Sequence, residues 1–111
     1  MGGSAAETSG FFNMAEKAWQ DAGRTTAPQK VGGFWYCLAD NAEVKMKDYV
    51  YDYLQVLGDN IARPVANSMK NFDKYAIKDT LAEMAGTGCE EVFLCSATDE
   101  LSELDRLLEI L

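Results

Sequence analysis

Histidine is missing from the sequence altogether, and this absence removes several classes of enzyme. The Ser-His-Asp and Cys-His mechanisms in their usual form need an imidazole, and so does a histidine general base near neutral pH. Zinc sites with histidine ligands are excluded on the same ground. Long hydrophobic runs are missing too, because the longest uncharged apolar run, residues 31–39, is less than half as long as a membrane-spanning helix. The sequence therefore predicts neither histidine chemistry nor a membrane span.

Basic residues are also scarce. The chain of 111 residues has 10 of them against 18 acidic residues, which gives a net charge of -8. A surface of this sign repels polyanions, so we expect neither nucleic acid nor an anionic membrane as a partner. The remaining composition, 48% hydrophobic and 25% charged, is typical of a soluble globular protein of one domain.

Cysteine occurs three times, at Cys37, Cys89 and Cys95. The spacing matches neither a CxxC redox pair nor a four-cysteine zinc site, so we expect no metal. An odd number of cysteines without a signal peptide indicates reduced thiols and a cytoplasmic location. The thiols can be small buried hydrophobes, or one of them can act as a nucleophile if a lysine or a helix dipole forms the thiolate.

Hydrophobic periodicity predicts a single domain over residues 11–111, preceded by a disordered or vector-derived leader at residues 1–10. We expect helices at 11–22, 42–57, 59–69, 73–85 and about 100–111, and buried strands at 31–39 and 91–96. We expect helix caps at Ser9 for the first helix, at Asp40 or Asn41 for the second and at Thr98 or Asp99 for the last. The apolar stripes expected to face the core are Phe11, Met14, Ala15, Ala18, Trp19 and Ala22; Met46, Tyr49, Val50, Tyr53, Leu54 and Leu57; Ile61, Val65 and Met69; Ile77, Leu81 and Met84; and Leu101, Leu104, Leu107, Leu108 and Leu111.

The order α-β-α-α-α-β-α indicates an α/β fold with two buried strands of the parallel type. Two strands are too few to form a stable sheet by themselves, because stable sheets usually have about four to six strands and the apolar edges of these two would remain unpaired. Either other copies of the chain complete the sheet, or the chain is part of a larger fold.

Two stretches resemble a known family. Residues 19–54, WQDAGRTTAPQKVGGFWYCLADNAEVKMKDYVYDYL, and residues 86–111, GTGCEEVFLCSATDELSELDRLLEIL, resemble the late part of bacterial-luciferase-like monooxygenases. The resemblance covers about residues 12–111. It implies a partial (β/α) barrel and a flavin (FMN) or deazaflavin cofactor. A complete barrel needs eight strand–helix units, so this chain matches only the final portion, and no catalytic residue of the family can be assigned to it.

Candidate residues of a cofactor or ligand site lie where the two strands end: Trp35, Tyr36, Cys37, Asp40, Ser96 and Thr98. Trp35 and Tyr36 point to opposite faces, and one ring can stack on a planar ligand unless both belong to the core. Asp40 can act as a base or simply cap a helix. The Ser96 and Thr98 hydroxyls can donate to a ligand.

Three functions remain open. The chain can be a segment of a luciferase-like oxidoreductase that works as a homo-oligomer, with a dimer expected from the frequency of two-fold symmetry. It can instead bind a small apolar ligand at a subunit interface or catalyse weak hydrolysis through Cys37 or Cys95. The third possibility is an assembly module without a substrate.

Overall fold

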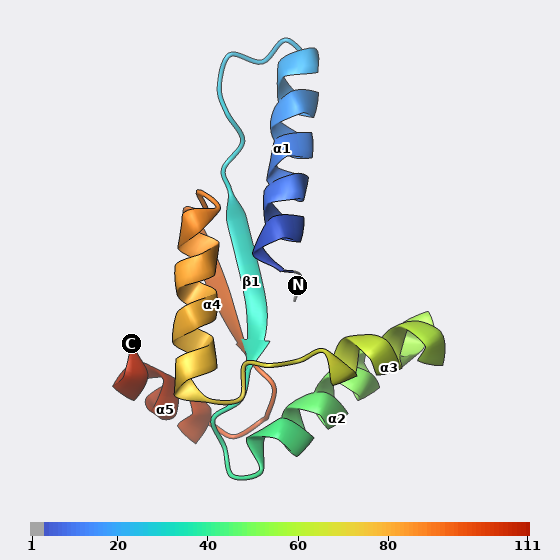
Figure 1. Cartoon of the computed structure of the whole chain (residues 1–111), viewed down its shortest axis with the longest axis vertical. Helices are drawn as coiled ribbons and strands as arrows, with labels where there is room; N and C mark the ends of the chain where they lie inside the picture. Colours follow the sequence, from blue (N-terminus) through green and yellow to red (C-terminus); the bar gives the residue numbers. More distant parts are fainter. Residues whose placement is uncertain (1–3) are drawn as a thin grey trace.

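A computed structural model describes residues 4–111 as a mixed α/β chain (Figure 1). The predicted order of helices and strands is confirmed, with one additional 3-10 turn after the second helix. The elements are α1 (Ala5–Asp21), β1 (Val31–Tyr36), α2 (Ala42–Leu54), η1 (Gln55–Leu57), α3 (Asp59–Asn67), α4 (Lys74–Gly86), β2 (Glu91–Ser96) and α5 (Ser102–Ile110).

The two strands pair in parallel, as predicted, with Val31 opposite Glu91 and Tyr36 opposite Ser96. The bounds of β2 agree with the sequence prediction, whereas β1 ends three residues earlier than expected. The reason is that the Cys37 N–H leaves the ladder and donates to the Asn71 carbonyl oxygen at 3.0 Å. Within residues 4–111 the sheet has these two strands and no others.

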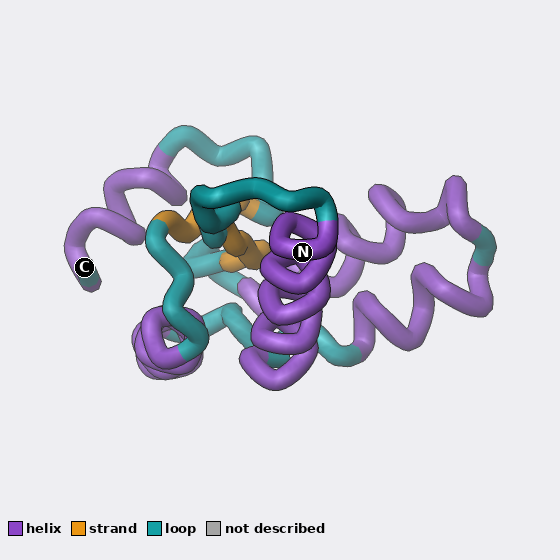
Figure 2. Tube along the Cα trace, turned by 90° about the horizontal axis from the view of Figure 1, so that it is seen from above, coloured by secondary structure: helices purple, strands orange, loops and turns teal. Residues whose placement is uncertain are grey.

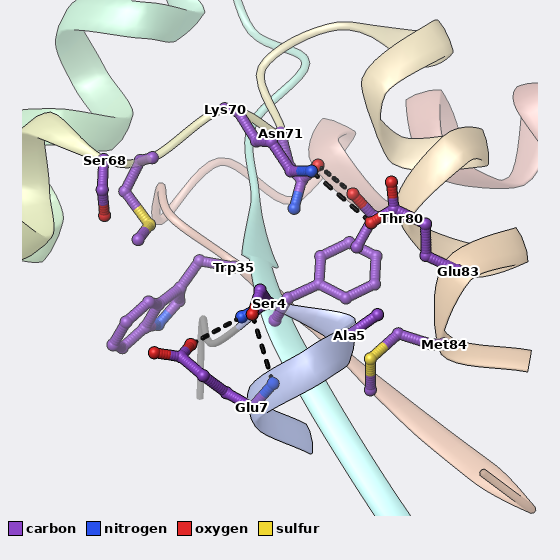
Figure 3. A pocket seen from close by; sticks show the side chains of 12 residues that line it. Ser4, Ala5, Glu7, Trp35, Ser68, Lys70, Asn71, Thr80, Glu83 and Met84 are labelled. Carbon is purple, nitrogen blue, oxygen red and sulfur yellow. Dashed lines mark hydrogen bonds and ion pairs between the residues drawn. The ribbon is translucent and has the colours of Figure 1, made fainter. Parts of the chain in front are cut away.

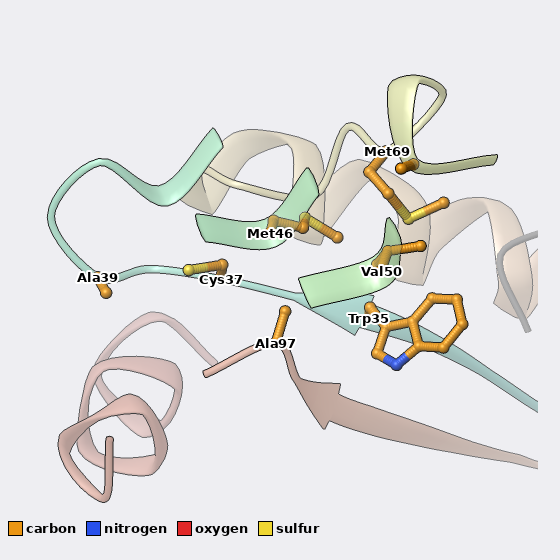
Figure 4. Packing of buried hydrophobic residues seen from close by; sticks show 8 residues of the cluster. Trp35, Cys37, Ala39, Met46, Val50, Met69 and Ala97 are labelled. Carbon is orange, nitrogen blue, oxygen red and sulfur yellow. The ribbon is translucent and has the colours of Figure 1, made fainter. Parts of the chain in front are cut away.

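Alternation along β1 sends side chains to two separate clusters. Phe34 and Tyr36 pack against Ile77 of α4 and Leu107 of α5. On the other face, Trp35 and Cys37 pack with a cluster that includes Met46, Val50, Ala66 and Met69 (Figure 4). The core is therefore split by the strand pair, with α4 and α5 on one face and α2 and α3 at the carboxyl end of the other.

The first helix begins earlier than predicted. Ser4 forms a capping box with Glu7: the Ser4 hydroxyl accepts from the Glu7 N–H at 3.2 Å, and the Glu7 carboxylate accepts from the Ser4 N–H at 2.8 Å. Ser9 is therefore not the cap, and residues 5–10 are helical instead of forming a disordered leader. Residues 1–3 of that proposed leader lie outside the described chain.

One other predicted cap is confirmed in position only, and one is wrong. Asn41 is the N-cap residue of α2, as one of the two alternatives predicted, but it adopts a left-handed conformation with φ 55° and its side chain makes no capping hydrogen bond. The last helix begins at Ser102, beyond Thr98 and Asp99, and also lacks a side-chain cap. In contrast, Asp73 accepts from two N–H groups in the first turn of α4, at 2.8 and 2.9 Å.

Several apolar stripes face solvent instead of a core. No residue of α1 is buried, and Phe11 and Met14 are each 68% exposed. In α5, Leu107 is buried, whereas Leu104 and Leu108 are exposed, and so are Leu101 and Leu111, which flank the helix. In α2, Met46 and Val50 are buried but Tyr49 and Tyr53 are exposed, and in α3 the buried residues are Ala62 and Ala66 instead of Ile61. These stripes have the spacing of core faces, but the rest of the chain does not reach them.

The chain is open for its size (Figures 1 and 2). Its radius of gyration is 15.6 Å, against about 13 Å for a compact domain of this length. Its accessible surface is 7170 Å², against roughly 6,100 Å² for a compact monomer of this mass. None of the helices in residues 4–111 has the length and apolarity needed to cross a membrane.

Candidate functional site at the carboxyl ends of the strands

Parallel pairing brings the ends of β1 and β2 to one edge of the sheet. The Ala97 N–H donates to the Tyr36 carbonyl oxygen at 2.9 Å, so the two loops that follow the strands leave side by side. This edge is where open α/β sheets and (β/α) barrels form their ligand sites. All six residues predicted from the sequence lie on or next to it.

A buried carboxylate connects the two loops. Glu103 of α5 is only 1% exposed, and its two oxygens accept from the Leu38 N–H at 2.9 and 3.2 Å. Arg106 donates to the same carboxylate at 3.2 Å, and the Cys37 thiol lies 3.9 Å from it. Glu103 therefore fixes the loop after β1 to the helix after β2, with its charge compensated by a guanidinium and a backbone donor.

A second carboxylate extends this network toward α2. Glu100 accepts from Lys45 at 3.0 Å and from Arg106 at 2.9 Å. Hydrogen bonds from Arg106 and Lys45 hold the pKa of Glu100 below its ordinary range, and Glu100 in turn raises the pKa of Arg106. Each cation of this network already has an anionic partner inside it. The arrangement therefore acts first as a clamp between α2 and α5.

The two aromatic candidates point to opposite faces, as predicted. Trp35 is buried in the cluster around α2 (Figure 4). Its ring meets the Tyr53 ring edge-on at 5.7 Å between centroids. Tyr36 is buried against α4 and α5, and this burial raises the pKa of its phenol. Both rings contribute to the core, and neither presents a free face at the edge.

The other predicted site residues are not brought together around a common space. Cys37 is fully buried, and this burial is the main reason that the pKa of its thiol is raised. The Ser96 hydroxyl donates to the Thr98 carbonyl oxygen at 2.8 Å and accepts from the Thr98 N–H at 3.2 Å, which closes a local turn. Asp40 is exposed to solvent. A thiol held neutral by burial is a poor nucleophile, so hydrolysis through Cys37 has no support from this geometry.

Sequence reasoning missed the members of the clamp: Lys45, Glu100 as an ion-pair partner, Glu103 and Arg106. One signal was available, because Glu103 lies four residues before Leu107 and so shares its helix face. A charged residue at that spacing is normally assigned to the solvent side of an amphipathic helix. Here its position over the end of β1 gives it a buried donor to satisfy.

A pocket of about 360 Å³ lies away from this edge, between the first turn of α1, β1, the loop before α4 and α4 itself (Figure 3). Phe34, Trp35, Met69 and Met84 supply its apolar lining. One wall contains a buried hydrogen bond of 2.8 Å from the Thr80 hydroxyl to the Asn71 side-chain oxygen. The pocket has the size of a small-molecule site, and the sequence analysis did not predict it.

Residues 4–111 contain no cluster of histidine, cysteine, aspartate or glutamate side chains that could hold a metal ion. Comparisons with protein-family models, with curated proteins and with solved structures give no match to this chain.

Proposed function

We propose that the chain is the C-terminal segment of a luciferase-like flavin- or deazaflavin-dependent oxidoreductase, and that it acts as a module of a homo-oligomer in which copies complete one sheet. The observation that carries the proposal is the unequal coverage of the strand pair. One face packs on α4 and α5, whereas the other is covered by α2 and α3 only around Trp35 and Cys37.

The uncovered part of that second face contains a large apolar side chain. Phe93 lies opposite Gly33 in the register and is 55% exposed. A doubly wound sheet has helices over both faces, whereas the strands of a barrel have helices only outside and turn the other face to a common interior. Beyond the part that α2 and α3 cover, the exposure of Phe93 leaves this face open to further strands, which supports a sheet completed by other copies.

A single chain does not fit the cofactor. Trp35 and Tyr36 are buried, so neither ring has a free face for an isoalloxazine. Lys45 and Arg106, the cations at the carboxyl edge, are paired with Glu100 and are not available to a phosphate. The proposal therefore places any cofactor site between copies, and we derive no catalytic step for the chain alone.

Two measurements test the proposal. Light scattering after size-exclusion chromatography is expected to give a multiple of the 12.2 kDa chain mass. Titration of the oligomer with FMN, and separately with a deazaflavin, is expected to quench the cofactor fluorescence. A lone chain of about 12 kDa at micromolar concentration would refute the module. An oligomer that quenches neither cofactor would refute the oxidoreductase part.

The pocket between α1 and α4 supports a second candidate, the binding of a small apolar ligand. Indole is a suitable probe, because its ring matches an apolar lining of two aromatic and two methionine side chains. Ala5 also lines the pocket, so Ala5→Trp is expected to fill it and abolish the indole-induced rise in melting temperature. Equal stabilisation of both proteins by indole would exclude the pocket as the binding site.

A further inference from the structure

The pocket between α1 and α4 is lined by a buried amide that is held in place on two sides. Asn71, in the loop before α4, is one of its lining residues and is only 6% exposed. The main-chain oxygen of Asn71 accepts from the Cys37 N–H at 3.0 Å. Its side-chain oxygen accepts from the Thr80 hydroxyl at 2.8 Å. These two hydrogen bonds tie Asn71 to the end of β1 and to α4, so its amide group has a defined position.

The nitrogen of this amide is a hydrogen-bond donor that the chain leaves unused. It carries two N–H groups, and no hydrogen bond within residues 4–111 involves it. Every fully buried side-chain nitrogen or oxygen of the described chain has a partner, so the Asn71 nitrogen is not sealed inside the protein. The Asn71 side chain points into the pocket, toward Trp35 and Ser4 (Figure 3). A fixed donor in a concave site is the kind of group that orients a ligand.

Thr80 decides which end of the amide faces the pocket. Its hydroxyl has one proton, and the Asn71 side-chain oxygen is the acceptor of that proton within residues 4–111. If the amide were reversed, the proton would lose its acceptor at a residue that is 8% exposed. The pocket therefore offers a ligand a donor, and the matching ligand atom is an acceptor.

The walls around this donor are apolar and closely packed. Phe34, Trp35, Met69 and Met84 are each between 3% and 7% exposed. A Cβ at Gly32 would collide with the Met84 methyl group, so the glycine is what allows Met84 to lie against β1. A ligand of this pocket therefore presents apolar surface to most of the lining and an acceptor to Asn71.

The charged lining residues limit the charge of the ligand. Glu7, Lys70 and Glu83 contribute two carboxylates and one ammonium group, a net charge of -1. Lys70 already has a partner, because its ammonium nitrogen lies 3.6 Å from a Glu83 oxygen. This balance disfavours a carboxylate as the acceptor and favours an uncharged oxygen.

We propose that the pocket binds a neutral aromatic ligand through a carbonyl oxygen that accepts a hydrogen bond from the Asn71 amide nitrogen. This inference rests on the ligand pocket proposed above as the second candidate function, and it adds the polar group that selects the ligand. It is independent of the oligomer and of any flavin.

The test compares indole with oxindole, which has the same two fused rings and one added carbonyl oxygen. Calorimetric titration of the wild-type protein is expected to give a dissociation constant about tenfold lower for oxindole, since oxindole satisfies a donor that indole leaves unpaired. Indole-2-carboxylate, whose acceptor is charged, is expected to bind more weakly than oxindole because of the net negative lining.

Asn71→Asp removes the donor and keeps an oxygen for Thr80, so this variant is expected to bind oxindole no more tightly than indole. Asn67→Asp is the matched control, because Asn67 is an exposed asparagine at the end of α3 that does not line the pocket. The control is expected to keep the full preference for oxindole. Circular dichroism verifies folding of both variants.

Nuclear magnetic resonance of the wild type gives a second measurement that needs no folded Asn71 variant. The side-chain amide protons of Asn71 are expected to move downfield when oxindole is added, and to stay in place when indole is added. Equal binding of the two probes, a preference that survives in Asn71→Asp, or amide protons that oxindole does not move would each overturn this inference and leave the pocket as an apolar site. Binding of neither probe would overturn both the inference and the pocket candidate.

Discussion

Glu103 offers the sharpest test of how the carboxyl edge is held together. Replacement by alanine removes the acceptor of the Leu38 N–H, which is bonded at 2.9 and 3.2 Å. A backbone donor left without a partner in a partly buried site costs about 1–3 kcal/mol. Arg106 keeps Glu100 as a partner at 2.9 Å, so its loss adds less than about 1 kcal/mol. We therefore expect Glu103→Ala to lower the free energy of unfolding by about 3 kcal/mol.

Glu103→Gln separates the hydrogen bond from the charge. The amide keeps the shape of the side chain and one acceptor oxygen for Leu38, so the expected cost is about 1 kcal/mol. For a domain of this length, each 1 kcal/mol lowers the melting temperature by about 4 °C. The expected shifts are therefore about 12 °C for the alanine variant and about 4 °C for the glutamine variant.

Thermal unfolding followed by circular dichroism at one fixed protein concentration measures both shifts. Glu109→Ala is the control on the same helix, because Glu109 is exposed, and it should change stability by less than about 0.5 kcal/mol. The reasoning fails if the alanine variant melts within about 4 °C of the wild type. It also fails if glutamine is as harmful as alanine, since the backbone hydrogen bond would then not be the main contribution.

Two further predictions concern pH and thiol reactivity. The pKa of Glu100 lies below its ordinary value of 4.5 because Arg106 and Lys45 donate hydrogen bonds to the carboxylate. The ionised carboxylate therefore stabilises the fold above pH 4.5, and this stabilisation is lost as the pH falls through the lowered pKa. The melting temperatures of wild type and Glu100→Gln should therefore converge as the pH is lowered from about 6 to about 3, and a constant difference would contradict the assignment. Burial raises the pKa of Cys37, so iodoacetamide should label the half-buried Cys89 first and Cys37 only after unfolding. Peptide mass spectrometry measures the labelling of each cysteine, and equal labelling of Cys37 and Cys89 in the native protein would contradict this prediction.

Local sequence patterns predicted the elements better than their ends. The apolar run at 91–96 is bounded by glutamates and a turn, and β2 has those bounds. The run at 31–39 is equally apolar throughout, so nothing in it could reveal that Cys37 leaves the ladder for the Asn71 carbonyl. The cap at Asp73 was readable because an aspartate precedes an uninterrupted helical pattern, whereas the aspartate at Asp99 lies in a loop that continues for two more residues.

The site was less predictable than the fold. Placing Trp35 and Tyr36 at the strand ends required only the alternation of a strand, and the structure agrees with it. Trp35 is buried by α2 on one face of the sheet, and Tyr36 is buried by α4 on the other face. The alternation of a strand does not say which helix will cover each face. The clamp through Glu103 depends on three segments meeting at one point, and no local pattern carries that information.

The apolar stripes that disagree with the structure of the single chain share one explanation. Phe11 and Met14 on α1, and Leu104 and Leu108 on α5, have the spacing of buried positions and yet are exposed. In the homo-oligomer proposed above, another copy would cover such stripes, because this periodicity is typical of helix faces from which water is excluded. The surplus accessible surface is comparable to one interface, so a partner that covers those faces would remove both the exposed stripes and the excess area.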